Sequence, residues 1–314
     1  MATIHDVAKK SGYSVSTVSR VLNSKNHVSD SARQQIEAAI QALDYVPNEI
    51  ARDLSHGKNN TIGVILPHTQ HPYFTEILNG VIDKAFATRY RVVILPSEYD
   101  ETIEVEYLEQ LRRKAFDAII FTSRGISLEK LAEYTKYGPI VCCENPQRSD
   151  LLAVYSNRRP AYIEAFLWLK NQGITNITIL LSREYESSAT SQVVLDTYFE
   201  VFDAYPESSK IISGVTTYED GVRVGKERLV NDESIECIFA NVDNVAAGVR
   251  SVYLKNGQKV PLLLGQENQL SGKLLNISTI DHHLKAIGHR CFDVATETTT
   301  QKQFVFESEF ILRT

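Results

Sequence analysis

The chain has 314 residues, 43% of them hydrophobic, and a formal net charge of −6 at pH 7. This length exceeds what one compact core usually holds, so we expect a small unit and a larger one. No apolar run is long enough to span a membrane, and the amino terminus lacks the basic-then-apolar pattern of a secretion signal. These features argue against membrane and secreted classes and predict a cytoplasmic protein.

The acidic charge is not spread evenly along the chain. Residues 1–60 contain seven Lys or Arg and six Asp or Glu, a charge of +1, which leaves −7 for residues 61–314. A charge of +1 is a weak electrostatic footprint for nucleic acid. A DNA-binding unit at the amino terminus would therefore depend on its shape and on being presented twice.

The run from Thr3 to Asn23 predicts two short helices joined by a tight turn. Thr3 is placed to cap the first helix, and Asp6, three residues later, completes a capping box. Gly12 can take the positive φ that ends a helix, and Ser14 is placed to cap the next one. This arrangement is typical of a helix-turn-helix that reads DNA.

The second helix, predicted at Val15–Leu22, leaves polar residues on its exposed face and at its leading end. Such residues meet base edges in the major groove. Arg20 suits guanine, Ser16 suits several bases, and Val15 suits the methyl group of thymine. Phosphate contacts are expected from the remaining polar positions. The expected DNA-contacting set here is Ser14, Val15, Ser16, Thr17, Ser19, Arg20 and Asn23. The alternative is a small helical hairpin with a solvated polar face.

The run TIHDVAKKSGYSVSTVSRVLN, followed by VPNEIARDLSHGKNNTIGVILP, closely resembles the amino-terminal region of the lactose/galactose repressor (LacI/GalR) family. The likeness continues more loosely to the carboxyl terminus. It implies a sequence-specific transcriptional repressor that binds operator DNA as a homodimer. It also implies control by a small-molecule effector, a sugar or sugar derivative, bound between two lobes.

A third helix is predicted at Asp30–Leu43, capped by Ser29, and its apolar stripe would close the core of the head. The resemblance implies phosphate contacts by His27, Ser29, Tyr45 and Asn48. The alternative for Tyr45 is that its ring completes the core of the head.

Residues 47–55 predict a separate short helix with proline in its first turn. Nine residues are too few for a helix that persists alone. The resemblance implies a hinge helix that orders when two copies pair over DNA, with Leu54 wedged into the minor groove beside Ala51. The alternative is a polar linker turn.

From Thr61 onward the sequence alternates short apolar strands with helices, the pattern of parallel α/β sheets. In the first series, strands are predicted at Ile62–Leu66, Arg91–Leu95, Ala118–Thr122 and Ile140–Cys143, and helices at Tyr73–Thr88, Glu104–Lys114 and Ser127–Tyr137. In the second series, strands are predicted at Ile177–Leu181, Lys210–Ser213, Cys237–Ala240 and Leu262–Gly265, and helices at Pro160–Gln172, Ser191–Tyr205, Gly221–Asn231 and Asn244–Asn256. A last helix, His283–Thr299, and a strand, Phe304–Leu312, complete the chain.

The predicted fold class is an all-α helix-turn-helix head followed by an α/β body of two doubly wound parallel-sheet lobes, similar to periplasmic binding proteins. The predicted division is a head at 1–46, a hinge helix and linker at 47–60, a first lobe at 61–158 plus 281–304, and a second lobe at 159–280 plus 305–314. The crossings near 158–160, 281 and 304 are implied by the resemblance. Ligands of such sheets bind at the carboxyl ends of strands, so the cleft between the lobes is the expected effector site.

The loop from Pro67 to Phe74 follows the first strand and brings two aromatic side chains to a helix start. Tyr73 and Phe74 are candidate walls of the effector site, because aromatic faces stack on sugar C–H groups and on flat heterocycles. The alternative is packing in the core. Together with the positions that the family uses for ligand contacts, the expected first-lobe set is His71, Tyr73, Phe74, Ser123, Arg124, Glu144 and Asn157.

In the second lobe, residues 239–248 read FANVDNVAAG and resemble the family's F-A-x-N-D-x-x-A-x-G. Asp243 follows a strand and opens a helix, where its carboxylate is expected to accept hydrogen bonds from ligand hydroxyls. The alternative is that it only caps the helix. The expected second-lobe contacts are Tyr218, Asp243 and Gln266.

Three departures from the family pattern affect the second lobe. The helix at 191–198 carries no arginine, Gly265-Gln266-Glu267-Asn268 replaces Gly-Phe-Asp-Asp, and Val242 replaces an asparagine. The effector site is therefore expected to differ from the common sugar-binding arrangement. In the family that the chain resembles, members that form tetramers add a leucine heptad beyond this point, whereas this sequence stops at Thr314, so the resemblance implies a dimer.

Other chemistry is not predicted. His282, His283, His289 and Cys291 fit no zinc-ligand spacing, and no Ser/His/Asp or Cys/His set marks a nucleophile, so no metal, cofactor or catalytic residue is expected. A solvated acidic helix face is predicted for Glu101, Glu104, Glu106 and Glu109. The competing functions are a solute-binding protein of a transporter, which the head argues against, and a nucleotide-dependent oxidoreductase, for which no G-x-G-x-x-G follows a strand.

Overall fold

The computed structural model describes residues 2–22, 28–46, 59–231 and 235–313. The chain divides into two compact units, residues 1–59 and 60–314. The predicted hinge helix at 47–55 lies outside the described residues.

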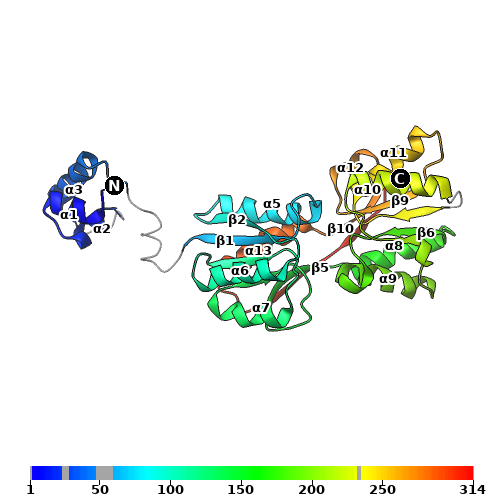
Figure 1. Cartoon of the computed structure of the whole chain (residues 1–314), viewed down its shortest axis with the longest axis horizontal. Helices are drawn as coiled ribbons and strands as arrows, with labels where there is room; N and C mark the ends of the chain where they lie inside the picture. The colour runs from blue at the N-terminus through cyan, green and yellow to red at the C-terminus, as the bar shows by residue number, and fades with distance from the viewer. Residues whose placement is uncertain (1, 23–27, 47–58, 232–234, 314) are drawn as a thin grey trace. The chain divides into compact units, whose positions relative to one another are not determined.

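The head is a three-helix unit built from α1 (Ile4–Ser11), α2 (Val15–Leu22) and α3 (Asp30–Ala42) (Figure 1). The predicted capping box is present, because Thr3 Oγ1 accepts from Asp6 N while the Asp6 carboxylate accepts from Thr3 N. Gly12 ends α1 at a φ of 74°, where a side chain would be strained. The core of this unit consists of Val7, Ala8, Val18, Val21, Ile36 and Ala39.

The first lobe contains a fully parallel six-stranded sheet in the order β11-β5-β4-β3-β1-β2. Its strands are β1 (Thr61–Leu66), β2 (Arg91–Pro96), β3 (Ala118–Phe121), β4 (Ile140–Cys142), β5 (Leu152–Asn157) and β11 (Gln303–Glu307). Its helices are α5 (Pro72–Phe86), α6 (Glu101–Arg112), α7 (Leu128–Tyr134) and α13 (Leu284–Thr296).

The second lobe contains a six-stranded sheet in the order β12-β10-β9-β8-β6-β7, in which only β12 is antiparallel to its neighbour. Its strands are β6 (Ile177–Leu180), β7 (Ile211–Ile212), β8 (Cys237–Phe239), β9 (Leu262–Gln266), β10 (Ser278–Asp281) and β12 (Glu309–Ile311). Its helices are α8 (Arg159–Asn171), α9 (Ala189–Phe202), α10 (Tyr218–Asn231), α11 (Asp243–Lys255) and α12 (Leu270–Leu274).

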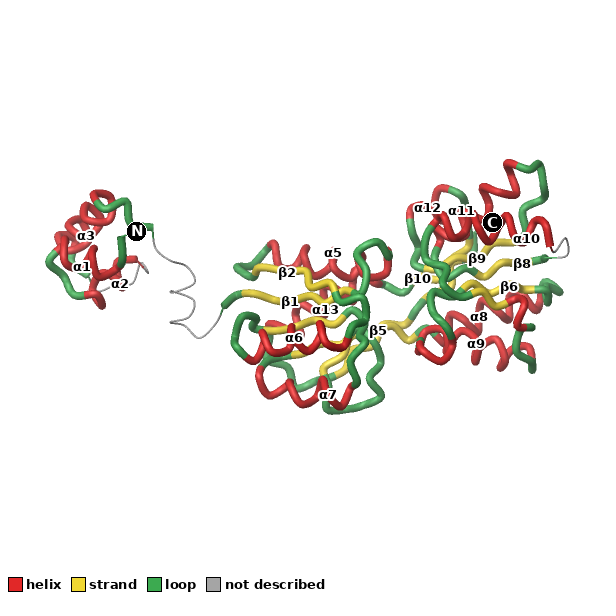
Figure 2. Tube along the Cα trace, viewed as in Figure 1, coloured by secondary structure: helices red, strands yellow, loops and turns green. Residues whose placement is uncertain are grey.

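Helices cover both faces of each sheet (Figure 2), so each lobe has two cores. In β1, Ile62 and Val64 face α5 and α13, whereas Ile65 faces the core under α6 and α7. This alternation is the geometry of a strand. It confirms the predicted class of a helical head followed by two doubly wound lobes.

The helices α5 and α13 pack tightly against each other on one face of the first sheet. A Cβ atom added at Gly80 of α5 would lie 2.2 Å from the carbonyl oxygen of Lys285, and one at Gly288 of α13 would lie 2.1 Å from that of Ile77. Only glycine allows the two backbones to approach so closely. The returning helix α13 is therefore fixed against the first lobe.

Some elements differ from the prediction. The strands β5 and β10 were not predicted, and the single strand expected at Phe304–Leu312 is wrong, because two strands occupy this segment. β11 pairs with the first sheet and β12 with the second, with Ser308 between them, so the last crossing comes after Glu307 rather than near 304. The pairing partner, which lies far away in sequence, decides which sheet each half joins.

Candidate functional site

The leading end of α2 is ordered by hydroxyl groups. Ser14 Oγ accepts from the backbone N–H of Thr17 at 3.2 Å, and it lies 2.8 Å from Ser16 Oγ and 2.9 Å from Thr17 Oγ1. Ser14, Ser16 and Arg20 are exposed, while Thr17 and Ser19 are half-buried. The exposed groups therefore project from a capped helix of the kind that enters a DNA groove.

Two of the predicted DNA-contacting residues also belong to the packing of the head. Val15 is half-buried against the helical core, so only part of its side chain is open to a ligand. Tyr45 packs against the same core, as the alternative for this residue stated. Ser29 caps α3 by accepting from Ala32 N at 3.4 Å. The other predicted DNA-contacting residues lie outside the described residues: Asn23, His27, Asn48, Ala51 and Leu54.

The loop after β1 is anchored at the start of α5. His71 Nδ1 accepts from Tyr73 N at 3.2 Å, and burial lowers the pKa of His71 to about 4, with His68 and Arg158 adding to the effect. Tyr73 donates from its hydroxyl to the carbonyl oxygen of Cys143 at 3.3 Å. Phe74 is only 5% exposed and belongs to the core of the first lobe, so it is not a free wall.

At the carboxyl ends of β3 and β4, two charged side chains pair. Arg124 Nε lies 2.5 Å from Glu144 Oε1, and Arg124 also donates to the carbonyl oxygen of Ile126 at 2.7 Å. Burial raises the pKa of Glu144, and the guanidinium of Arg124 opposes that shift. Ser123 is half-buried beside them, and Asn157, at the end of β5, donates to Glu307 at 2.9 Å.

Glu104 orders the loops next to this pair. Its carboxylate is fully buried and accepts from Ser97 Oγ, Gly125 N and Ile126 N at 2.9 to 3.0 Å. The prediction of a solvated acidic face is therefore wrong for Glu104. The carboxylate joins the loop after β2, which carries Tyr99, to the loop after β3.

Asp243 does not reach open space. It is fully buried, its Oδ1 accepts from Thr279 Oγ1 at 2.6 Å, and its Oδ2 accepts from Gln269 N at 2.7 Å. Gly265 and Gly272 leave room for it, since a Cβ atom at either would lie within 2.3 Å of a carboxylate oxygen. Burial raises the pKa of Asp243 to about 7. Both carboxylate oxygens of the expected acceptor of ligand hydroxyls are thus bonded to protein groups. One of these groups lies at the start of α12, a helix that was not predicted.

Gln266 is also committed to protein partners. Its Oε1 accepts from the Tyr162 hydroxyl at 2.8 Å and lies 3.1 Å from His282 Nε2, and its Nε2 donates to the Ala240 carbonyl oxygen at 3.2 Å. Burial lowers the pKa of His282 well below its ordinary value, so this histidine is neutral at pH 7. Tyr218 begins α10 and is 41% exposed, outside this network.

Sequence reasoning missed two arginines that contact first-lobe tyrosines. The Arg183 guanidinium lies 4.2 Å from the ring centre of Tyr99, and that of Arg158 lies 5.2 Å from the ring centre of Tyr73. Arg183 follows β6, and Arg158 follows β5. Their positions after strand ends were the available signal, but β5 itself was not predicted.

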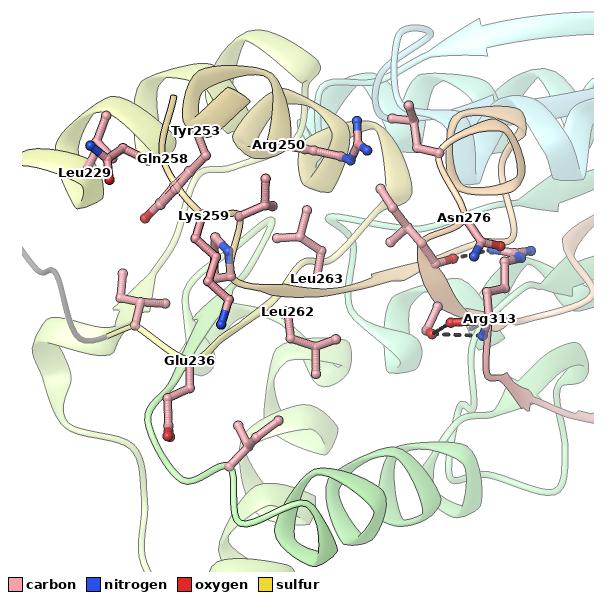
Figure 3. Close-up of a pocket in the computed structure, with 17 residues that line it drawn as sticks. Leu229, Glu236, Arg250, Tyr253, Gln258, Lys259, Leu262, Leu263, Asn276 and Arg313 are labelled. Atoms are coloured by element: carbon pink, nitrogen blue, oxygen red, sulfur yellow. Dashed lines mark hydrogen bonds between the residues drawn. The ribbon is translucent and has the colours of Figure 1, made fainter. Parts of the chain in front are cut away.

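The cavity in Figure 3 lies elsewhere. It has a volume of about 1010 Å³ and is lined by residues at the amino-terminal ends of the second sheet, such as Glu236, Leu262 and Ser278. The labelled cations Arg250 and Lys259 point away from each other in this view. Parallel α/β sheets bind ligands at the opposite, carboxyl ends of their strands. The arginine and tyrosine contacts, rather than this cavity, therefore mark the candidate effector site.

The part of the chain that the structure describes offers neither a metal site nor a membrane-spanning helix. No group of three or more His, Cys, Asp or Glu side chains there could hold a metal ion. No helix in these ranges combines the length and the apolar character that crossing a bilayer requires. The four cysteines are buried and unbridged.

Comparison with known proteins connects the two units. The family described as "Bacterial regulatory proteins, lacI family" matches residues 3–48, and that described as "Periplasmic binding proteins and sugar binding domain of LacI family" matches residues 59–301. The chain is 35% identical to catabolite control protein B of Bacillus subtilis (strain 168) over 294 residues, which cover 94% of each protein. It is 31% identical to the NTD biosynthesis operon regulator NtdR of the same strain, covering 92% of this chain and 90% of that one.

The fold has a counterpart among solved structures. The lac repressor dimer bound to operator and the anti-inducer ONPF is similar with a TM-score of 0.80 and 17% sequence identity, covering 99% of this chain and 98% of that chain. This likeness supports the arrangement of a helical head and two parallel-sheet lobes.

Proposed function

This chain belongs to the LacI family of DNA-binding transcriptional regulators with an effector-binding domain, and we propose that it represses genes by binding a pseudo-palindromic operator as a homodimer. Regulators of this family are not enzymes. A small-molecule effector, a sugar or sugar derivative, would bind between the two lobes and control the affinity for operator DNA. The matched domain description, which names sugar binding, supports this effector class.

The observation that carries the DNA-binding part is the exposed polar side of α2. Ser16 and Arg20 project from a helix whose first turn is fixed by Ser14, on a head held together by its own core. An arginine at such a position can give two hydrogen bonds to guanine, and a serine can bond several bases. The head therefore has the donors for base reading on a rigid element.

An exposed apolar face on the first lobe supports the homodimer. The edge strand β2 and the end of α5 expose Ile82 by 40%, Phe86 by 91% and Ile94 by 45%, and Ile94 lies on the face of the sheet that α5 covers. An apolar patch of this kind on a globular unit marks an association surface. A second copy of the chain is the occupant that the proposed repressor requires, because two heads read two half-sites.

We propose the same functional division as the sequence indicates: a head at 1–46, a hinge at 47–60, and the two lobes. Closure of the lobes around the effector would change the separation of the paired hinges. Allosteric coupling between two sites is typically worth about 1–3 kcal/mol, and we expect a coupling of this size between effector and DNA. An effector that lowers operator affinity would relieve repression, and one that raises operator affinity would strengthen it.

The test is an unbiased selection of duplex DNA by the intact purified chain, followed by gel shifts on the selected sequences at several salt concentrations. We expect a two-fold symmetric site, with affinity that falls as salt rises because phosphate contacts release counterions. Selection of no preferred duplex, in the absence and presence of sugars and sugar derivatives, would overturn the proposed function.

A further inference from the structure

Two arginines lie against aromatic rings of the first lobe. Arg183, on the loop after β6, stacks over Tyr99, which follows β2, with 4.2 Å from guanidinium carbon to ring centre. Arg158, between β5 and α8, lies over Tyr73, which follows β1, at 5.2 Å. Both stacks bring together residues that follow the carboxyl ends of strands, where α/β sheets place their ligands.

Neither of these two cations forms a close ion pair within the described part of the chain; Arg183 interacts electrostatically with Glu144, but that carboxylate is paired with Arg124. Among the described residues, no carboxylate oxygen lies within 4.0 Å of the guanidinium of Arg158 or Arg183, whereas the third nearby arginine, Arg124, is paired with Glu144. Arg158 has His282 Nε2 at 3.5 Å, and that histidine is neutral. Glu267 raises the pKa of Arg158 without forming a close ion pair with it. The carboxylate of Glu267 accepts from Gln269 Nε2 at 2.9 Å, and burial raises the pKa of Glu267 well above its ordinary value.

The two side chains predicted to accept hydrogen bonds from a sugar in the second lobe, Asp243 and Gln266, already accept them from the protein. Both carboxylate oxygens of Asp243 accept hydrogen bonds from the protein, and the Gln266 carbonyl oxygen accepts from Tyr162. Hydroxyl groups of a neutral sugar require such acceptors as well as donors. The two acceptors predicted for the second lobe are therefore occupied, whereas Arg158 and Arg183 present guanidinium donors beside aromatic faces.

We propose that the effector of this chain carries an anionic group, a phosphate or a carboxylate, bound by Arg158 and Arg183 between the two lobes. The inference rests on the proposed effector site. A planar guanidinium binds phosphate and carboxylate oxygens through two parallel hydrogen bonds, which are stronger than those between neutral groups. Tyr73 and Tyr99 would then cover the uncharged part of the ligand.

Thermal unfolding of the intact chain tests this assignment, since a ligand that binds only the folded state stabilises it. The probes are glucose, glucose 6-phosphate, gluconate and inorganic phosphate at equal concentration and ionic strength. We expect stabilisation by at least one of the three anions and none by glucose. The phosphate and carboxylate arms separate the two anion classes.

The variants are Arg183→Gln and Arg158→Gln, with Arg159→Gln as matched control. Arg159 is the next residue along the chain but is exposed and paired with Glu200. We expect the anion to bind each of the first two variants at least about tenfold more weakly, a loss of about 1.4 kcal/mol per tenfold, and the control to bind as the parent does. If Arg158→Gln does not fold, Arg183→Gln alone carries the test.

Three results would overturn the anionic assignment: stabilisation by glucose equal to that by the anions, stabilisation that persists unchanged in Arg183→Gln, or no stabilisation by any of the anions. Operator binding is measured on the same preparations. If operator binding is intact while the anions fail, the repressor function stands and only the effector class is wrong. If no duplex is preferred either, the proposed function itself fails.

Discussion

Arg20 is the side chain on α2 from which the sharpest consequence for DNA follows. It is exposed in the last turn of a capped helix, and its guanidinium suits the paired acceptors of guanine in the major groove. We expect Arg20→Ala to cost about 1–3 kcal/mol at one base pair of each half-site and to relax specificity there. Gel shifts on operators substituted at single positions measure this effect. Equal weakening on the operator and on random DNA would show that Arg20 contacts only phosphates.

Asp243 makes the stability of the body depend on pH. Burial raises the pKa of its carboxyl from 3.8 to about 7. Between about pH 4 and pH 7, Asp243 is therefore protonated in the folded state and ionised in the unfolded state. The free energy of unfolding must therefore fall as pH rises from about 4 to 7, by about 4 kcal/mol for this residue if the shift is complete. Below pH 4 both states are protonated, and this contribution is constant.

Asp243→Asn is expected to remove that slope, because the amide does not titrate. Urea unfolding of the parent and of Asp243→Asn between pH 4 and 8 gives the difference in free energy of unfolding. The variant should lose stability relative to the parent at pH 4 and recover relative to it toward pH 8. A difference that does not change with pH would show that Asp243 titrates near its ordinary value in the folded protein.

Local and non-local residues differ in how well the sequence predicts them. The Thr3–Asp6 box and the Ser29 cap join groups three residues apart, so their pattern is visible in the sequence. Asp243 was placed correctly next to a helix start, but its partners are Thr279 and Gln269. These partners lie on β10 and at the start of α12, two elements that were not predicted. The hydrogen bonds that occupy the carboxylate of Asp243 could therefore not be predicted from the sequence.

At the scale of elements, Glu104 holds two loops of the first lobe in register. Its buried carboxylate accepts from Ser97 Oγ and from two backbone N–H groups of the loop after β3. Glu104→Gln would turn an amide donor toward one of these N–H groups and leave a buried donor unsatisfied. We expect a loss of about 1–3 kcal/mol in the free energy of unfolding, measured by urea titration.

Glu106→Gln is the matched control, since Glu106 lies two residues along the same helix and is exposed. Its effect should stay within about 0.5 kcal/mol, as for most surface substitutions. If the Glu104 and Glu106 variants lost equal stability, the carboxylate of Glu104 would not hold the loops as the structure indicates.

Strand pairing explains which elements the sequence could predict. Apolar runs bounded by turns identified β1, β3, β6 and β8 to within about a residue, because burial on both faces leaves a continuous apolar signal. β2 was predicted as buried, yet it is an edge strand with exposed Val93 and Ile94. Val92 and Leu95 contribute to the cores of its own lobe, and we propose that a second copy of the chain covers its exposed apolar residues.

At the scale of the whole molecule, the feature with the largest consequence is the exposed edge of the first sheet at β2. A monomer would expose the apolar side chains of β2 and α5 to water, which costs about 25 cal/mol for each Å² that a partner would otherwise cover. The proposed homodimer would remove this cost and bring two heads together. Dimer formation and operator affinity are therefore expected to fall together when this face is made polar.

Phe86→Asp tests that link, because Phe86 ends α5 and is 91% exposed, so the substitution removes no packing within the chain. Phe199→Asp is the control: Phe199 is exposed by 45% on α9 of the other lobe, where it stacks on Tyr205. Sedimentation velocity should show Phe86→Asp as a monomer at concentrations where the parent and the control are dimers. Its operator affinity should drop by at least about tenfold, since one head then binds one half-site without the gain in effective concentration from its linked partner. A dimeric Phe86→Asp with parental operator affinity would place the contact between copies on another face.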